Sequence, residues 1–142
     1  MADRVVVDAS ALLPLVLSDT AERTDYAAAI VERAASEALE LVIPQMCHFQ
    51  LAAVLSRKVR SRVVSNATAQ EFFEQLDALG FELFVESFRY SELYDRAMAM
   101  NCQAGDAIYL TLAQDLDLPI ATLDGGMRQA ARQAGIVVYE VR

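Results

Sequence analysis

Residues 4–10 read RVVVDAS, a run of three valines that ends at an aspartate and a serine. An unbroken β-branched run without polar alternation indicates a strand that is covered on both faces by other elements. Similar apolar runs follow at 41–43, 81–85, 119–122 and 136–139. We therefore expect five buried strands, the first at 4–8.

Helical spacing of Ala, Leu, Glu and Gln predicts helices between these strands, at 21–38, 45–58, 68–79, 90–100, 106–115 and 125–133. Thr68-x-x-Glu71 is expected to open the third helix as a capping box, and Gly80 and Gly135 to end helices. Alternating strands and helices with short connections favour right-handed crossovers. The predicted fold is a three-layer α/β/α arrangement around a mostly parallel sheet of four to five strands.

Length and composition suggest one domain over residues 1–142, because 142 residues with 55% hydrophobic content can bury one sizeable core. The sequence has neither an apolar stretch of the roughly 18 to 20 residues that crosses a bilayer nor a signal-like start. We expect a cytoplasmic protein without a membrane partner. Cys47 and Cys102 belong to no CxxC pair, and we expect buried thiols without a disulfide or a zinc site.

The net charge of −8 argues against a broad basic surface for nucleic acid. One dense basic run stands at the end of the second predicted helix and contains Arg57, Lys58, Arg60 and Arg62. We expect a solvated helix end favoured by the helix dipole, with contact to an RNA backbone as the alternative.

Three aspartates stand where an α/β sheet binds ligands, beyond the carboxyl ends of its strands. Asp8 ends the first strand, Asp124 follows the fourth, and Asp106 opens the helix just upstream of that strand. Singly, each has an ordinary explanation as a helix cap or a turn residue. Together, three converging carboxylates repel one another unless a cation neutralises them, and hard oxygen ligands suit Mg²⁺ or Mn²⁺.

The same positions resemble the motifs of the PIN domain, and the match extends over almost the whole chain. The family's late-helix pattern D-A-x-Y-L-x-L-A is present at 106–113, and Thr122-Leu123-Asp124 matches its Thr-x-Asp. Asp8 matches the aspartate at the end of its first strand. The late-helix pattern is the most specific of these.

This resemblance implies a metal-dependent ribonuclease of the kind found among VapC-type toxins, which hydrolyses RNA phosphodiesters. Asp8, Asp106 and Asp124 would hold Mg²⁺ or Mn²⁺ ions. The family's bacterial toxins commonly form homodimers and are blocked by a cognate antitoxin whose peptide enters the acidic site. The expected partners are therefore an RNA substrate, an antitoxin and a second copy of the chain.

Gln50 is the one departure, because it stands where the family has a glutamate in the helix after the second strand. An amide keeps one carbonyl oxygen as a ligand but loses the charge, so metal affinity should fall. We expect Gln50 to be a weak fourth member of the catalytic set. The alternative is a catalytically inactive PIN domain that acts as an antitoxin-binding or RNA-binding module.

His48 lies two residues before Gln50, and we expect it to pack in the core. An alternative hypothesis turns it toward the acidic site as the missing ligand, which would favour Mn²⁺. Ser10 and Thr122 are placed to hydrogen-bond the neighbouring carboxylates and fix their rotamers. Simple helix capping is the equally weighted alternative for Ser10.

Helical spacing also relates a further set of residues, which suggest core or a dimer surface rather than a base-stacking platform: Tyr90, Leu93, Tyr94, Ala97 and Met98. A phosphotransfer domain with Asp8 as nucleophile is a further rival. It is disfavoured because Ser10 occupies the place of a second acid and because the single lysine, Lys58, lies far from the later strands.

Overall fold

The computed structural model describes residues 2–141, and its centre is a sheet of four parallel strands in the order β3-β2-β1-β4. The strands are β1 (Asp3–Val7), β2 (Leu39–Pro44), β3 (Glu82–Phe84) and β4 (Ile120–Ala121). In the register, Val6 of β1 lies between Val42 of β2 and Ile120 of β4. The predicted parallel sheet is confirmed.

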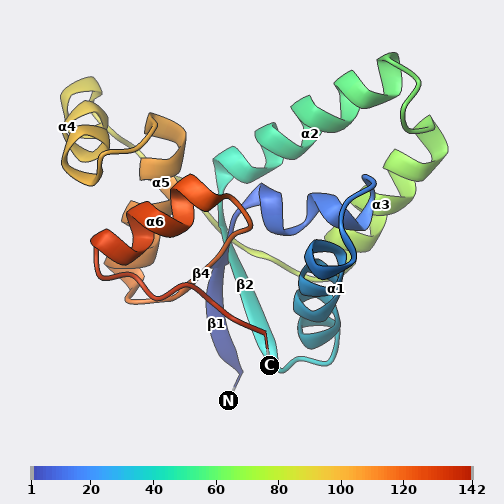
Figure 1. Ribbon diagram of the computed structural model, residues 1–142, viewed down its shortest axis with the longest axis horizontal. Helices are drawn as coiled ribbons and strands as arrows, with labels where there is room; N and C mark the ends of the chain where they lie inside the picture. The colour runs from blue at the N-terminus through green and yellow to red at the C-terminus, as the bar shows by residue number, and fades with distance from the viewer. Residues whose placement is uncertain (1, 142) are drawn as a thin grey trace.

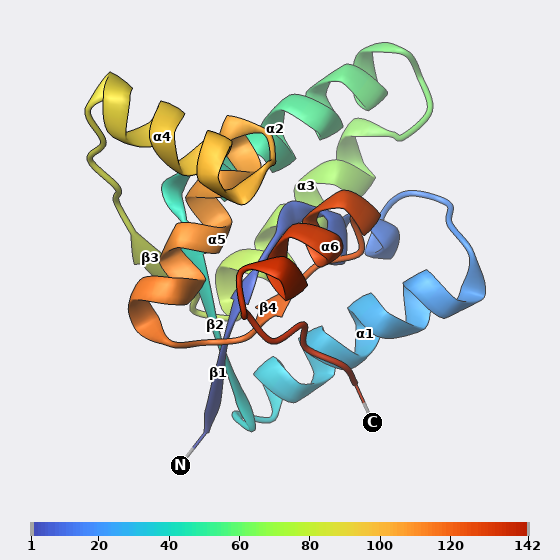
Figure 2. The ribbon, with the colours of Figure 1, turned by 60° about the vertical axis from the view of Figure 1, so that its left-hand side comes forward.

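Helices cover both faces of this sheet, so the predicted three-layer arrangement is confirmed. They are α1 (Ala21–Ala35), α2 (Gln45–Arg60), α3 (Asn66–Ala78), α4 (Tyr90–Met100), α5 (Ala104–Leu116) and α6 (Gly125–Gln133). Figure 1 shows α1 and α3 to the right of the sheet and α4, α5 and α6 to its left. In the turned view of Figure 2, α1 and α5 remain on opposite sides. Each predicted helix is present, within three residues of its expected ends.

Two details of the expected element ends differ. The third helix begins at Asn66 and is capped by Ser65, whose hydroxyl accepts the N–H of Thr68 at 3.1 Å. The predicted capping box at Thr68 is therefore wrong, because Thr68 already lies inside the first turn. Gly80 and Gly135 have φ values of +69° and +75°, the left-handed conformation expected after a helix.

The predicted fifth strand at 136–139 is reduced to a single bridge, in which Val138 pairs with Ile120 of β4. The physical reason is the length of the partner, because β4 has only two residues and offers few backbone groups to a further strand. Val137 is 69% exposed, which shows that this segment is not covered on both faces as predicted.

Two short 3-10 helices follow β1 and were not predicted: η1 (Ala9–Ala11) and η2 (Leu13–Leu15). Ala11 and Leu12 are fully buried and carry the chain across the end of the sheet toward α1. The valines of β1 are also fully buried, between α1 and its neighbours on one side and α5 on the other. Within residues 2–141, no helix is both long and apolar enough to cross a membrane.

Truncation of Ile30 should test the α1 layer. Ile30 is fully buried on α1, so Ile30→Ala removes packed atoms and leaves a cavity that should lower the free energy of unfolding by about 2–5 kcal/mol. Urea denaturation followed by circular dichroism measures this. Val137→Ala is the matched control, with an expected change within about 0.5 kcal/mol. Equal effects of the two substitutions would contradict the burial described for α1.

Candidate active site

Asp8 is a carboxylate buried at the end of the central strand, with 5% of its surface exposed. The hydroxyls of Ser10 and Thr122 both donate to its Oδ2 atom, at 2.6 and 2.8 Å. Its side chain does not cap η1, although Asp8 is the residue before that helix. Burial raises the pKa of Asp8, the two hydroxyls lower it, and the charge of Asp124 raises it further. The hydroxyls therefore offset part of the cost of burying this group.

Ser10 and Thr122 also bind the loop that follows β4. The Ser10 hydroxyl accepts the N–H of Leu123 at 2.9 Å, and the Thr122 hydroxyl accepts the N–H of Asp124 at 3.1 Å. Ser10 lies within η1 and not at its cap, so its capping alternative is wrong. The two hydroxyls thus join the end of β1 to the loop that carries Asp124.

Two arginines hold the same loop from outside, and the sequence had not pointed to them. Arg128 donates from Nε to the carbonyl of Thr122 at 2.7 Å, and Arg23 donates from Nη1 to the carbonyl of Leu123 at 3.0 Å. Each carbonyl thereby gains a charged donor, the stronger class of hydrogen bond. The loop is fixed from α1, from α6 and from the end of β1.

Asp124 and Asp106 approach Asp8 from two helix starts. Asp124 caps α6, where its Oδ1 atom accepts the N–H groups of Gly126 and Met127 at 2.8 and 3.3 Å. Asp106 lies in the first turn of α5, which begins two residues earlier than predicted, at Ala104. Burial first, and then the charges of Asp124 and Asp8, raise the pKa of Asp106 to about 6.

The three aspartates therefore share one electrostatic neighbourhood at the carboxyl end of the sheet. Among residues 2–141, however, no group of three or more His, Cys, Asp or Glu side chains is arranged so that it could hold a metal ion directly. The donor chemistry still fits a hard divalent cation, because all three groups are carboxylates whose charges repel one another.

Gln50 lies beside Gly105, next to Asp106, and its carbonyl oxygen already accepts one hydrogen bond. The buried hydroxyl of Tyr109 donates to Gln50 Oε1 at 2.6 Å. Tyr109 is the tyrosine of the late-helix motif, and burial raises its pKa, so the phenol stays protonated and remains a donor. The amide nitrogen of Gln50 lies toward Gly105, the residue before Asp106, and adds two N–H donors at this place. The sequence had suggested only a weakened oxygen ligand at this position.

The core position predicted for His48 is wrong, because this side chain is exposed. The buried stripe of α2 consists of Cys47, Leu51 and Leu55, and His48 follows Cys47 by one residue, which turns it away from the core. Its neighbour Phe49 is 72% exposed beside Gln50. An exposed phenylalanine next to the site is a candidate contact that sequence reasoning missed, and the spacing from the buried stripe would have revealed it.

Other predicted positions lie away from the aspartates. Arg57, Lys58 and Arg60 form the last turn of α2, at the end that points away from the sheet in Figure 1. Arg62 follows in the left-handed conformation, with φ of +62°.

Of the two cysteines, Cys47 is buried, which raises its pKa to about 12, whereas Cys102 is only partly buried.

Two solved structures share this architecture. A structure titled "Crystal structure of PAE2754 from Pyrobaculum aerophilum" is similar at a TM-score of 0.66, with 21% identity, 92% of this chain covered and 87% of that one. A domain of a functionally unknown protein from Methanocaldococcus jannaschii DSM 2661 is similar at 0.55, with 17% identity and coverage of 99% and 92%. These likenesses show a shared fold. No curated protein matches the chain.

The family model of the PIN domain matches residues 5–133, which is most of the chain. The protein therefore belongs to the PIN domain family, as the motifs at Asp8, 106–113 and 122–124 had indicated. PIN domains are commonly nucleases, and those nucleases typically use divalent metal ions.

Replacement of Thr122 should measure what its hydroxyl contributes. Thr122→Val keeps the shape but removes both the donor to Asp8 and the acceptor for the N–H of Asp124. Loss of buried partners should lower the free energy of unfolding by about 1–3 kcal/mol, measured by urea denaturation. Thr68→Val on the exposed face of α3 is the control. If the two substitutions lowered the free energy of unfolding by the same small amount, that result would argue against this network.

The raised pKa of Asp106 predicts a stability that depends on pH. Because the folded state holds this proton more tightly than the unfolded chain, its contribution is present below pH 4 and is lost as pH rises to about 6. Asp106→Asn should therefore raise the melting temperature at pH 7 and leave it nearly unchanged at pH 4. Thermal denaturation in a chelator checks this, with exposed Asp77→Asn as control. A lower melting temperature for Asp106→Asn at pH 7 would refute the repulsion.

Proposed function

We propose that this protein is a divalent-cation-dependent ribonuclease that hydrolyses RNA phosphodiesters, similar to the VapC-type toxins of its family. The observation that carries the proposal is the convergence of Asp8, Asp106 and Asp124, where burial and then the charges of Asp124 and Asp8 raise the pKa of Asp106 to about 6. Such repulsion is relieved when a cation occupies the site, so the protein is arranged to gain stability from metal binding.

Asp8, Asp106 and Asp124 would hold Mg²⁺ or Mn²⁺ through carboxylate oxygens. Such an ion supplies activation of a water molecule and stabilisation of the leaving oxygen. Both hydroxyl donors bind Oδ2 of Asp8, so they fix the orientation of the carboxylate. Asp124 likewise has Oδ1 committed to the start of α6 and Oδ2 left for the site. Ser10 and Thr122 therefore act as positioning residues.

Gln50 would act differently from a metal ligand. The Tyr109 hydroxyl already uses one of the two lone pairs of Oε1, so the amide N–H groups are the better placed part of Gln50 to bind a substrate. A phosphate oxygen of RNA is an acceptor that such a donor would bind. We propose that Gln50 weakens metal affinity but retains a contact with the phosphodiester.

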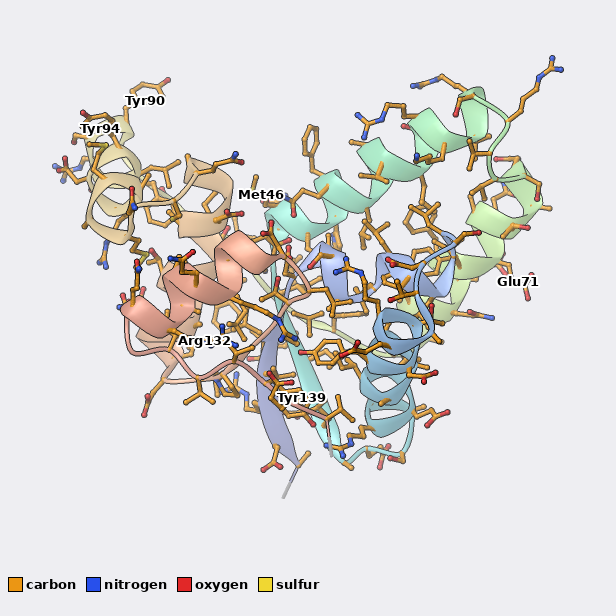
Figure 3. All side chains as sticks on the ribbon, in the orientation of Figure 1. Met46, Glu71, Tyr90, Tyr94, Arg132 and Tyr139 are labelled. Atoms are coloured by element: carbon orange, nitrogen blue, oxygen red, sulfur yellow. The ribbon has the colours of Figure 1, made fainter. Side chains whose placement is uncertain are left out.

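Partners follow from the same surfaces. An acidic site favours the basic segment of a cognate antitoxin, and exposed Phe49 beside it offers a surface for a base or an apolar antitoxin side chain. Tyr90 and Tyr94 project from the outer end of α4, where Tyr90 is fully exposed, which supports a homodimer contact there. Figure 3 shows both side chains at the edge of the molecule. The proposed setting is the cytoplasm.

RNA cleavage with Mg²⁺ and then Mn²⁺ tests the proposal on the natural chain, Asp8→Asn and Gln50→Glu. Asp8→Asn should abolish cleavage with its circular dichroism unchanged. Gln50→Glu adds a charge worth on the order of 1 kcal/mol or more beside a divalent cation. We therefore expect Gln50→Glu to cleave at least about tenfold faster than the natural chain.

Glu71→Gln, on the far side of the molecule from α4 in Figure 3, is the control and should cleave at the natural rate. If no form cleaves, including Gln50→Glu, the enzyme proposal fails. Binding of RNA or of an antitoxin peptide would then become the better account. Equal cleavage by Asp8→Asn and the natural chain would instead reject the site assignment.

A further inference from the structure

A hollow lies apart from the aspartates, between α4, α5 and the segment that joins β3 to α4. Its volume is about 700 Å³, within the range of roughly 300–1,000 Å³ typical of ligand pockets. The apolar part of its lining includes Phe84, Phe88, Leu112 and Leu116. Figure 2 shows β3, α4 and α5 together on the left-hand side of the molecule.

The polar lining of this cavity is strongly acidic. It contains the carboxylates of Glu86, Glu92, Asp95 and Asp115, against the single cation Arg96. Glu92 also pairs with Arg89 at 3.3 Å, but both side chains are largely exposed, so that pair contributes little neutralisation. The cavity therefore favours a positively charged occupant.

Two buried oxygens in the lining are without a hydrogen-bond partner among the described residues, Thr111 Oγ1 and Glu86 Oε1. Thr111 is 4% exposed and sits on the α5 wall of the cavity. Unpartnered buried polar atoms cost free energy and usually indicate a missing partner. Burial also raises the pKa of Glu86, and a cation beside it would favour the charged form. Both oxygens can accept a hydrogen bond from an N–H donor.

We propose that this cavity binds a guanidinium or ammonium group carried on an apolar stem. The N–H donors of the head group would satisfy Glu86 and Thr111, and the stem would lie against Leu112 and Leu116. An arginine or lysine side chain of a peptide has this chemistry, and so does a small free alkylguanidine or alkylamine. This inference is independent of the proposed ribonuclease activity.

The aspartate cluster is the competing cation site, and the two can be separated by residue. Thr111 and Asp115 lie further along α5 than Asp106, on a different part of the helix surface. A cation attracted by charge alone would go to Asp8, Asp106 and Asp124. A cation that also needs an apolar wall would go to the cavity.

Titration of the ¹⁵N-labelled protein with n-butylguanidine tests the proposal, with n-butylurea as the neutral probe of matched shape. We expect butylguanidine to shift the amide signals of Glu86, Thr111 and Asp115, and butylurea to leave them unchanged. Glu86→Gln should weaken binding by about tenfold or more, since hydrogen bonds to charged groups are the stronger class. Thr111→Val should weaken it several-fold without lowering the melting temperature, because it removes only an unpartnered hydroxyl.

Glu71→Gln, a distant surface carboxylate, should bind butylguanidine as the natural chain does. Asp115→Asn replaces Glu86→Gln if the latter proves unstable, and should also weaken binding. A capped Gly-Arg-Gly peptide, compared with its citrulline counterpart, distinguishes a peptide side chain from a small free molecule as the source of the cation. Binding of the arginine peptide identifies a protein side chain as the occupant class, and binding of butylguanidine alone identifies a small molecule.

Unchanged affinity in both Glu86→Gln and Asp115→Asn would overturn the proposal. Equal binding of butylurea would do so as well. Signal shifts confined to Asp8, Asp106 and Asp124, and abolished in Asp106→Asn, would place the cation at the sheet end instead of the cavity.

Discussion

A carboxylate buried at the end of a strand must be hydrogen-bonded or neutralised. The elements around Asp8 are therefore constrained to bring donors to it. The hydroxyls that meet it come from η1 and from the end of β4, so the central strand and its neighbour must pair in one register. Those hydroxyls in turn hold the loop whose carbonyls bind Arg23 and Arg128. Displacement of any one of these elements would leave Asp8 buried without its donors.

Much of this arrangement could be predicted because the signals are local. The valines of β1 mark a strand buried on both faces, and an aspartate directly after a parallel strand must lie at the ligand-binding edge. The prediction of a fifth strand was wrong because a strand needs a partner. The length of that partner, the two-residue β4, cannot be inferred from residues 136–139 alone. The predicted cap at Thr68 was wrong because Ser65, three residues earlier, is also a capping residue and takes that position.

Features of the site that depend on contacts between distant segments could not be predicted. Gln50 and Tyr109 were each noticed, one as a departure and one as part of a motif. Only the packing of α2 against α5 shows that the phenol occupies the amide oxygen. His48 was misplaced because neighbouring residues on a helix differ by about 100° in direction, and the buried stripe begins at Cys47. Arg23 and Arg128 bind backbone carbonyls, which carry no side-chain signature.

The position of β4 beside β1 has a consequence for synthesis of the chain. A nascent chain that ends after α2 already carries Asp8 and Gln50, but it lacks the hydroxyl of Thr122 and both later aspartates. On one side β1 pairs with β2, which follows soon after it in the chain, but its other neighbour, β4, is separated from it by most of the domain, and a contact of such long separation carries a large loop-closure entropy. The acidic cluster is therefore completed only once the chain has been made as far as Asp124, and shorter nascent chains lack two of its three carboxylates when they end before Asp106.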